Sequence, residues 1–118
     1  MKNIVVLTQD KDIYSVMARA LGKDYEVSAV PSVRDLYEGR VKKPKLIIYD
    51  LSFPCDKAMA NCRRLKKLPL TRDVPIIAVS PIPWEKERRK VFKCTGAEHV
   101  LNKPFSIAEF REAVYSWV

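Results

Sequence analysis

Two kinds of segment alternate along the chain, short runs that are apolar throughout and longer stretches with periodic apolar positions. Three of the runs are rich in β-branched residues, as strands are when both faces of a parallel sheet are covered; they are residues 4–7, 46–49 and 76–79. Two weaker runs, at residues 25–30 and 99–102, mix polar with apolar positions, as edge or short strands do. The pattern predicts five strands.

The stretches between and after the strands repeat apolar residues every three to four positions, which is typical of amphipathic helices. We expect helices at about residues 13–21, with Gly22 just past the end, at 32–39 and 58–68, from after Pro83 to Gly96, and from Ser106 onward. Ser106 can cap the last of these, with Glu109 three residues later. Alternation of strands and helices predicts an α/β fold, a doubly wound parallel sheet with helices on both faces.

Polar residues follow the strands of this predicted sheet. Asp50 follows the third strand, Ser80 the fourth and Lys103 the fifth. The carboxyl ends of parallel strands meet at one edge, so these side chains should share a crevice. A carboxylate beside a hydroxyl and an ammonium suits a phosphoryl group, with Asp50 as the nucleophile and the other two as partners of the phosphoryl oxygens. The segment after the first strand adds Thr8, Gln9 and Asp10.

Length and composition indicate one packed domain over residues 1–118, with 47% hydrophobic residues. The longest apolar stretch, residues 74–84, is far shorter than the roughly 20 residues that cross a bilayer, so we expect no membrane insertion and a cytoplasmic protein. The net charge of +8 comes from basic runs at residues 40–45, 63–67 and 86–93. Such runs favour solvated helix faces over a nucleic-acid surface.

Several function classes lack their motifs. The chain has no phosphate-binding glycine loop and no GxSxG nucleophile turn, and its one histidine is His99. A phosphatase of related topology would need a second carboxylate beside Asp50, and Asp56 is six residues away. The three cysteines, an odd number, are expected to be free thiols. We therefore expect a protein that is not an enzyme.

Three segments of the chain resemble the receiver domains of two-component response regulators. Residues 45–54 resemble the third strand and phosphoacceptor loop, with Pro54 four residues after Asp50; residues 74–80 resemble the fourth strand with its switch hydroxyl; residues 96–105 resemble the fifth strand with its lysine-proline motif. The resemblance implies the flavodoxin-like strand order 2-1-3-4-5. It also implies Asp50 as phosphoacceptor, and Ser80 and Lys103 as the residues that sense the phosphoryl group.

The resemblance further implies a magnesium ion and protein partners. A histidine kinase or phosphotransfer protein would donate the phosphoryl group, and a downstream protein would read the surface of the fourth helix, fifth strand and fifth helix. We expect the interaction face to consist of residues 84–93, His99 and the fifth helix. The basic residues of this face would favour an acidic partner.

The chain departs from the family pattern in two features, the acidic pair after the first strand and the aromatic switch residue. The acidic pair that usually holds magnesium after the first strand is replaced by Thr8 and Gln9, and Asp10 comes one residue late. Asp50, the backbone carbonyl of Ser52, and either Gln9 or Asp10 would make only a weak magnesium site, since magnesium prefers carboxylate oxygens. Val100 stands at the usual aromatic switch position, where core packing is the better interpretation.

Three functions remain open from the sequence. The first is a receiver module that is phosphorylated on Asp50 or acts as an atypical receiver by protein-protein contact. The second is a phosphorylation-independent pseudo-receiver. The third, which only the net charge favours, is a basic nucleic-acid-binding domain.

Overall fold

Five parallel strands form one sheet in the order β2-β1-β3-β4-β5. The computed structural model describes residues 1–39, 42–51, 55–80, 89, 93 and 95–118. The strands are β1 (Lys2–Leu7), β2 (Tyr25–Val30), β3 (Leu46–Asp50), β4 (Ile76–Ser80) and β5 (His99–Asn102). The helices are α1 (Lys11–Leu21), α2 (Arg34–Tyr37), α3 (Cys55–Lys67) and α5 (Ile107–Trp117).

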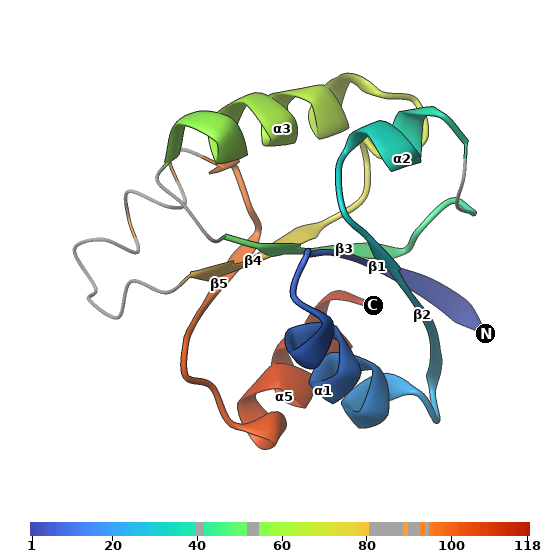
Figure 1. The fold of residues 1–118 in the computed structure, drawn as a ribbon, viewed down its shortest axis with the longest axis vertical. Helices are drawn as coiled ribbons and strands as arrows, with labels where there is room; N and C mark the ends of the chain where they lie inside the picture. The colour runs from blue at the N-terminus through green and yellow to red at the C-terminus, as the bar shows by residue number, and fades with distance from the viewer. Residues whose placement is uncertain (40–41, 52–54, 81–88, 90–92, 94) are drawn as a thin grey trace.

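The helices cover both faces of the sheet, with α2 and α3 on one face and α1 and α5 on the other (Figure 1). Alternate side chains of each central strand therefore enter two separate cores. Val5 and Ile47 belong to the core under α2 and α3, whereas Ile4 and Ile48 belong to the core under α1 and α5. Burial on both faces explains why residues 4–7, 46–49 and 76–79 of these strands are all apolar. The predicted fold class and strand order are confirmed.

Helix boundaries differ from the sequence expectation at two places. The helix α3 starts at Cys55 rather than near residue 58, because its polar first turn carries no apolar periodicity that the sequence could show. The helix α2 is only four residues long, and the Ser32 hydroxyl lies 3.2 Å from the Asp35 carboxylate instead of capping a backbone N–H. The expected helix between Pro83 and Gly96 lies largely outside the described residues.

Two helices begin at side-chain caps. The Ser106 hydroxyl accepts the backbone N–H of Glu109 at 3.0 Å, which confirms the predicted start of α5. Asp10 caps α1, and its Oδ1 accepts the backbone N–H groups of Asp12 and Ile13 at 2.9 and 3.2 Å. None of the helices in the described part of the chain has the length and apolarity needed for a bilayer span.

Candidate functional site

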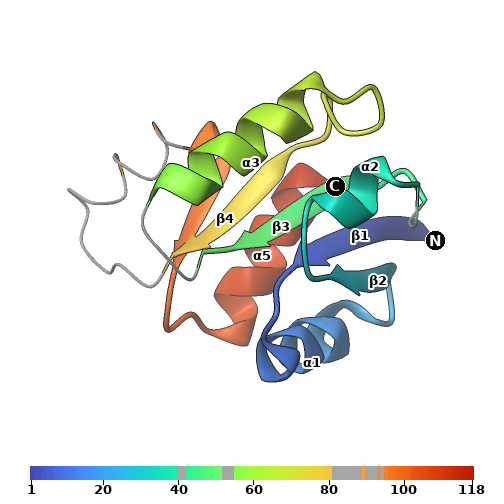
Figure 2. The ribbon, with the colours of Figure 1, turned by 45° about the horizontal axis from the view of Figure 1, so that its top comes forward.

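The carboxyl end of β3 places Asp50 at the centre of the predicted crevice. The strands β1, β3 and β4 point in the same direction, so their final residues reach one edge of the sheet (Figure 2). Asp50 is opposite Val79 of β4, and the backbone N–H of Leu51 continues the ladder to the Val79 carbonyl at 2.9 Å. Only 8% of Asp50 is exposed. A buried carboxylate must be compensated by donors or cations.

Lys103 supplies the first compensating group. Its Nζ lies 2.6 Å from Oδ1 of Asp50, and the side chains are 27% and 4% exposed, respectively. The backbone N–H of Lys103 also donates to the Ser80 carbonyl at 2.8 Å, which holds the lysine beside the end of β4. The Lys103–Pro104 peptide bond is cis. The structure thus brings Lys103 and Asp50 together as an ion pair.

Thr8 supplies the second compensating group. Its hydroxyl donates to Oδ2 of Asp50 at 2.7 Å and accepts the backbone N–H of Asp10 at 3.0 Å. The register of β1 against β3 pairs Leu7 with Tyr49, so the next residue of each strand, Thr8 and Asp50, are neighbours. From the sequence, Thr8 was considered only as the replacement of an acidic magnesium ligand. Its hydroxyl directly follows a strand adjacent to β3, and that position could have indicated the contact with Asp50.

The remaining expected ligands are arranged differently. Asp10 is exposed and is engaged as the cap of α1, so it would have to leave that cap to reach a metal ion. Gln9 is exposed as well. Ser52, whose backbone carbonyl was expected to contribute, lies outside the described residues. Ser80 ends β4 and is 1% exposed.

The donor set is a poor match for magnesium. Magnesium prefers carboxylate and other hard oxygen ligands, and this edge offers one carboxylate, whose two oxygens already accept from Lys103 and Thr8. Among the described residues, no three acidic, histidine or cysteine side chains are grouped as a metal site would need. The residues as arranged therefore do not fit a bound magnesium ion.

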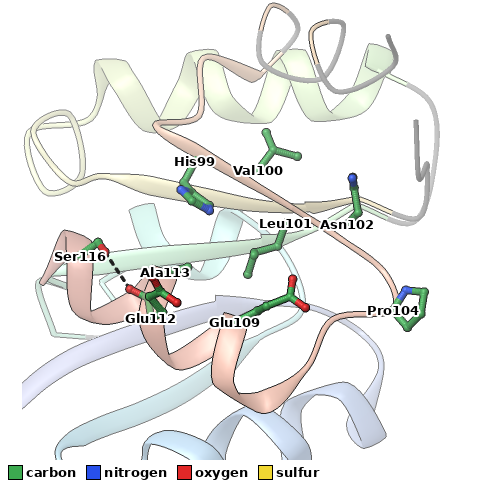
Figure 3. Close-up of a pocket in the computed structure, with 9 residues that line it drawn as sticks. All are labelled: His99, Val100, Leu101, Asn102, Pro104, Glu109, Glu112, Ala113 and Ser116. Carbon is green, nitrogen blue, oxygen red and sulfur yellow. Dashed lines mark hydrogen bonds between the residues drawn. The ribbon is translucent and has the colours of Figure 1, made fainter. Parts of the chain in front are cut away.

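Val100 packs in the core, as its replacement of an aromatic residue suggested. It is 1% exposed and belongs to the core under α2 and α3, while the next residue, Leu101, points to the opposite face (Figure 3). A groove of about 350 Å³ lies between β5 and α5, and Glu109 and Glu112 line it together with the half-buried His99. No lysine or arginine is among the lining residues that the structure describes. The groove beside α5 is thus acidic, whereas Arg89 and Lys93 of the same expected interaction face are exposed and basic.

Two titratable groups near the site are protonated at neutral pH. Burial raises the pKa of the Cys62 thiol to about 12, and the thiol is free. Burial likewise raises the pKa of Tyr49, the residue before Asp50, and Nδ2 of Asn61 donates to the Tyr49 hydroxyl oxygen at 2.6 Å. Neither group supplies a nucleophile beside Asp50.

A scan of protein-family models finds no match to the chain. Among curated proteins, the phosphate regulon transcriptional regulatory protein of Rhizobium meliloti is 31% identical over 114 residues, which cover 93% of this chain and 49% of that protein. The chain thus spans about half the length of this relative.

Solved structures share the fold. A chemotaxis response regulator of Vibrio cholerae superposes with a TM-score of 0.83 at 18% identity, covering 100% of this chain and 99% of that one. The receiver domain of a sensor histidine kinase from Pseudomonas aeruginosa, whose structure has a magnesium ion coordinated in its active site cleft, gives a TM-score of 0.77 at 22% identity, with coverages of 98% and 96%. By strand order, structural similarity and sequence similarity, the chain has the fold of response regulator receiver domains.

Proposed function

We propose that the chain is an atypical receiver that transmits a signal by protein-protein contact. Asp50 is phosphorylated slowly or not at all. The observation that carries this proposal is the occupation of both Asp50 oxygens, by the Lys103 ammonium at 2.6 Å and the Thr8 hydroxyl at 2.7 Å. Asp50 is therefore held in place by one neutral and one cationic donor, and among the described residues no second carboxylate lies beside it to recruit a metal ion.

The chemistry of phosphoryl transfer explains why this arrangement matters. An attacking carboxylate and the incoming phosphoryl group are both negative, and a divalent cation normally offsets their repulsion and the charge that develops during transfer. Thr8 brings no negative charge to this edge of the sheet. The hydrogen bond from the Thr8 hydroxyl also withdraws electron density from Oδ2 and so lowers the nucleophilicity of that oxygen. Both effects slow the reaction.

We propose that Lys103 and Ser80 would sense a phosphoryl group on Asp50. Lys103 lies where its ammonium would pair with a phosphoryl oxygen on Asp50, and Ser80 ends the adjacent strand. In the unmodified protein, the same lysine neutralises Asp50. The ion pair therefore stabilises a single arrangement of the site, which is the behaviour expected of a pseudo-receiver.

The partners follow from the same proposal. A histidine kinase or phosphotransfer protein would act upstream, and a downstream protein would contact β5, α5 and the segment before them, without any enzymatic activity of the chain itself. The cytoplasm is the compartment where such partners meet. Arg89 and Lys93 are exposed, so the basic half of this face would still favour an acidic partner and bind more weakly as salt rises. The acidic groove beside α5 would favour a cationic side chain of that partner.

Phosphorylation by a small donor tests the proposal. The wild type and the double variant Thr8→Asp, Gln9→Asp would be incubated with acetyl phosphate and magnesium, and intact mass would report the modification. We expect little or no mass gain of the wild type and a clear gain of the double variant. Asp50→Asn in the double variant should abolish that gain, which assigns it to Asp50.

The matched control is the single change Gln9→Asp, which adds one charge but leaves the Thr8 hydroxyl in place. It should remain closer to the wild type than to the double variant. Rapid magnesium-dependent modification of the wild-type protein at Asp50 would overturn the proposal, because it would show that the existing donors complete a working site.

A further inference from the structure

A second concave site lies at the opposite end of the sheet from Asp50. It is a hollow of about 420 Å³ lined by residues at the amino ends of β1 and β2 and in the segment before β3. Figure 1 marks the N-terminus, where β1 begins. This volume falls within the roughly 300–1,000 Å³ of small-molecule sites. Its charged and polar lining side chains are those of Lys2, Asn3, Glu26, Lys42, Lys43 and Lys45. We call it the lysine hollow.

The charge of the lysine hollow is strongly unbalanced. Four lysines and one glutamate line the hollow, and the ion pair between lining residues in the described part of the chain joins Lys42 and Glu26 at 4.0 Å, with both side chains well exposed. Lys2, Lys43 and Lys45 have no acidic partner in the described part of the chain. Like charges gathered in one hollow repel one another, and an anion bound there would relieve that repulsion.

The backbone holds these lysines in place. Nδ2 of Asn3 donates to the Lys42 carbonyl at 3.1 Å, and the backbone N–H of Lys45 donates to the Asn3 carbonyl at 2.8 Å. Pro44, between them, is buried and fixes its own φ angle. The segment 42–45 is thus tied to β1 at both ends. A site that is already shaped loses less entropy when a ligand binds.

Asn3 also provides an unused acceptor. The residue is 7% exposed, and its Oδ1 has no hydrogen-bond partner among the residues that the structure describes. The amide cannot simply be reversed, because Nδ2 is needed by the Lys42 carbonyl. Buried polar atoms are nearly always satisfied, so an orphan acceptor beside a hollow indicates a missing donor. A hydroxyl or amino group of a ligand would supply it.

We propose that the lysine hollow binds a nucleoside di- or triphosphate. Its phosphates would lie among Lys2, Lys43 and Lys45, since a lysine ammonium binds phosphate as a point charge. A ribose hydroxyl or base amino group would donate to Oδ1 of Asn3. The site is separate from Asp50 and from the face formed by β5 and α5, and the inference does not depend on whether Asp50 is phosphorylated.

Calorimetry with two probes tests the proposal on the full chain. Adenosine triphosphate offers phosphates and donors, whereas inorganic tripolyphosphate offers phosphates alone. We expect the nucleotide to bind the wild type more tightly than tripolyphosphate does. The variant Lys43→Gln, Lys45→Gln should bind the nucleotide roughly tenfold more weakly, as the loss of two exposed charge pairs implies.

The matched control is Arg63→Gln, Arg64→Gln, which removes the same charge from exposed positions on α3 outside the hollow. It should leave nucleotide affinity nearly unchanged, and amide chemical shifts on nucleotide addition should move at residues 2–3, 26 and 42–45. Equal weakening in the two double variants would overturn the proposal in favour of nonspecific charge. The proposal would also be overturned if tripolyphosphate bound more tightly than the nucleotide. The same holds if duplex DNA or a polyglutamate peptide bound more tightly than the nucleotide at the same lysines.

Discussion

Replacing Thr8 by valine removes the hydroxyl that holds Oδ2 of Asp50 and keeps the side-chain shape. The lost contact is a 2.7 Å hydrogen bond to a carboxylate whose side chain is 4% exposed. Hydrogen bonds to charged groups contribute about 1.5–3 kcal/mol, and a buried carboxylate that loses its donor carries the full cost. The partner lost on the other side, the backbone N–H of Asp10, belongs to an exposed residue and can be hydrated. We expect the free energy of unfolding to fall by about 2 kcal/mol.

Urea unfolding followed by circular dichroism measures this change. With a slope of about 2 kcal/mol/M, the unfolding midpoint should fall by roughly 1 M with the slope unchanged. Thr8→Ser keeps the hydroxyl and should lose much less stability. In an Asp50→Ala background, Thr8→Val should lower the free energy of unfolding by roughly 1 kcal/mol or more less than it does in the wild type. That difference is the coupling energy between the two side chains. A cost that is the same in both backgrounds would refute the hydrogen bond as the source of the effect.

Three further predictions follow from the structure. Lys103→Met should destabilise the protein by about 3 kcal/mol in urea unfolding because it leaves Asp50 without its cation, and a loss below about 1 kcal/mol would contradict the ion pair. Ser106→Ala should cost about 1 kcal/mol through the lost cap of α5, whereas the exposed control Ser116→Ala should cost less than about 0.5 kcal/mol. Because burial raises the pKa of Cys62 from 9.0 to about 12, the unfolded thiol ionises first, so the free energy of unfolding should fall as the pH rises above 9. Cys62→Ala should reduce that slope in urea titrations at pH 8 to 11.

The sequence predicted most of the fold because the central strands are unmistakable. Residues 4–7, 46–49 and 76–79 are buried on both faces, except for the half-buried Tyr49, so these positions had to be apolar, and that requirement is visible in one sequence. The start of α3 was less visible. Its first turn carries Asp56 and Lys57, which show no apolar period.

The candidate site was predictable in its members but not in its contacts. Asp50 and Ser80 end neighbouring strands and Lys103 follows the next one, so topology brings these three positions to one edge of the sheet. That Thr8 donates to Asp50 depends on the register between β1 and β3, which the sequence does not specify. Asp10 was expected near a metal ion because of its charge, yet the backbone of α1 uses that carboxylate as a cap. Local capping competes with ligand binding for the same oxygens.

Magnesium affinity tests most directly whether Thr8 and Lys103 leave Asp50 without a competent metal site. Calorimetric titration of the wild type with magnesium chloride, beside the variant Thr8→Asp, Gln9→Asp, measures it under one set of conditions. The structure predicts at least roughly tenfold weaker binding by the wild type, because its site offers a single carboxylate whose oxygens are already engaged. The account would be contradicted if the wild type and the double variant bound magnesium with equal affinity and the substitution Asp50→Asn abolished magnesium binding by the wild type.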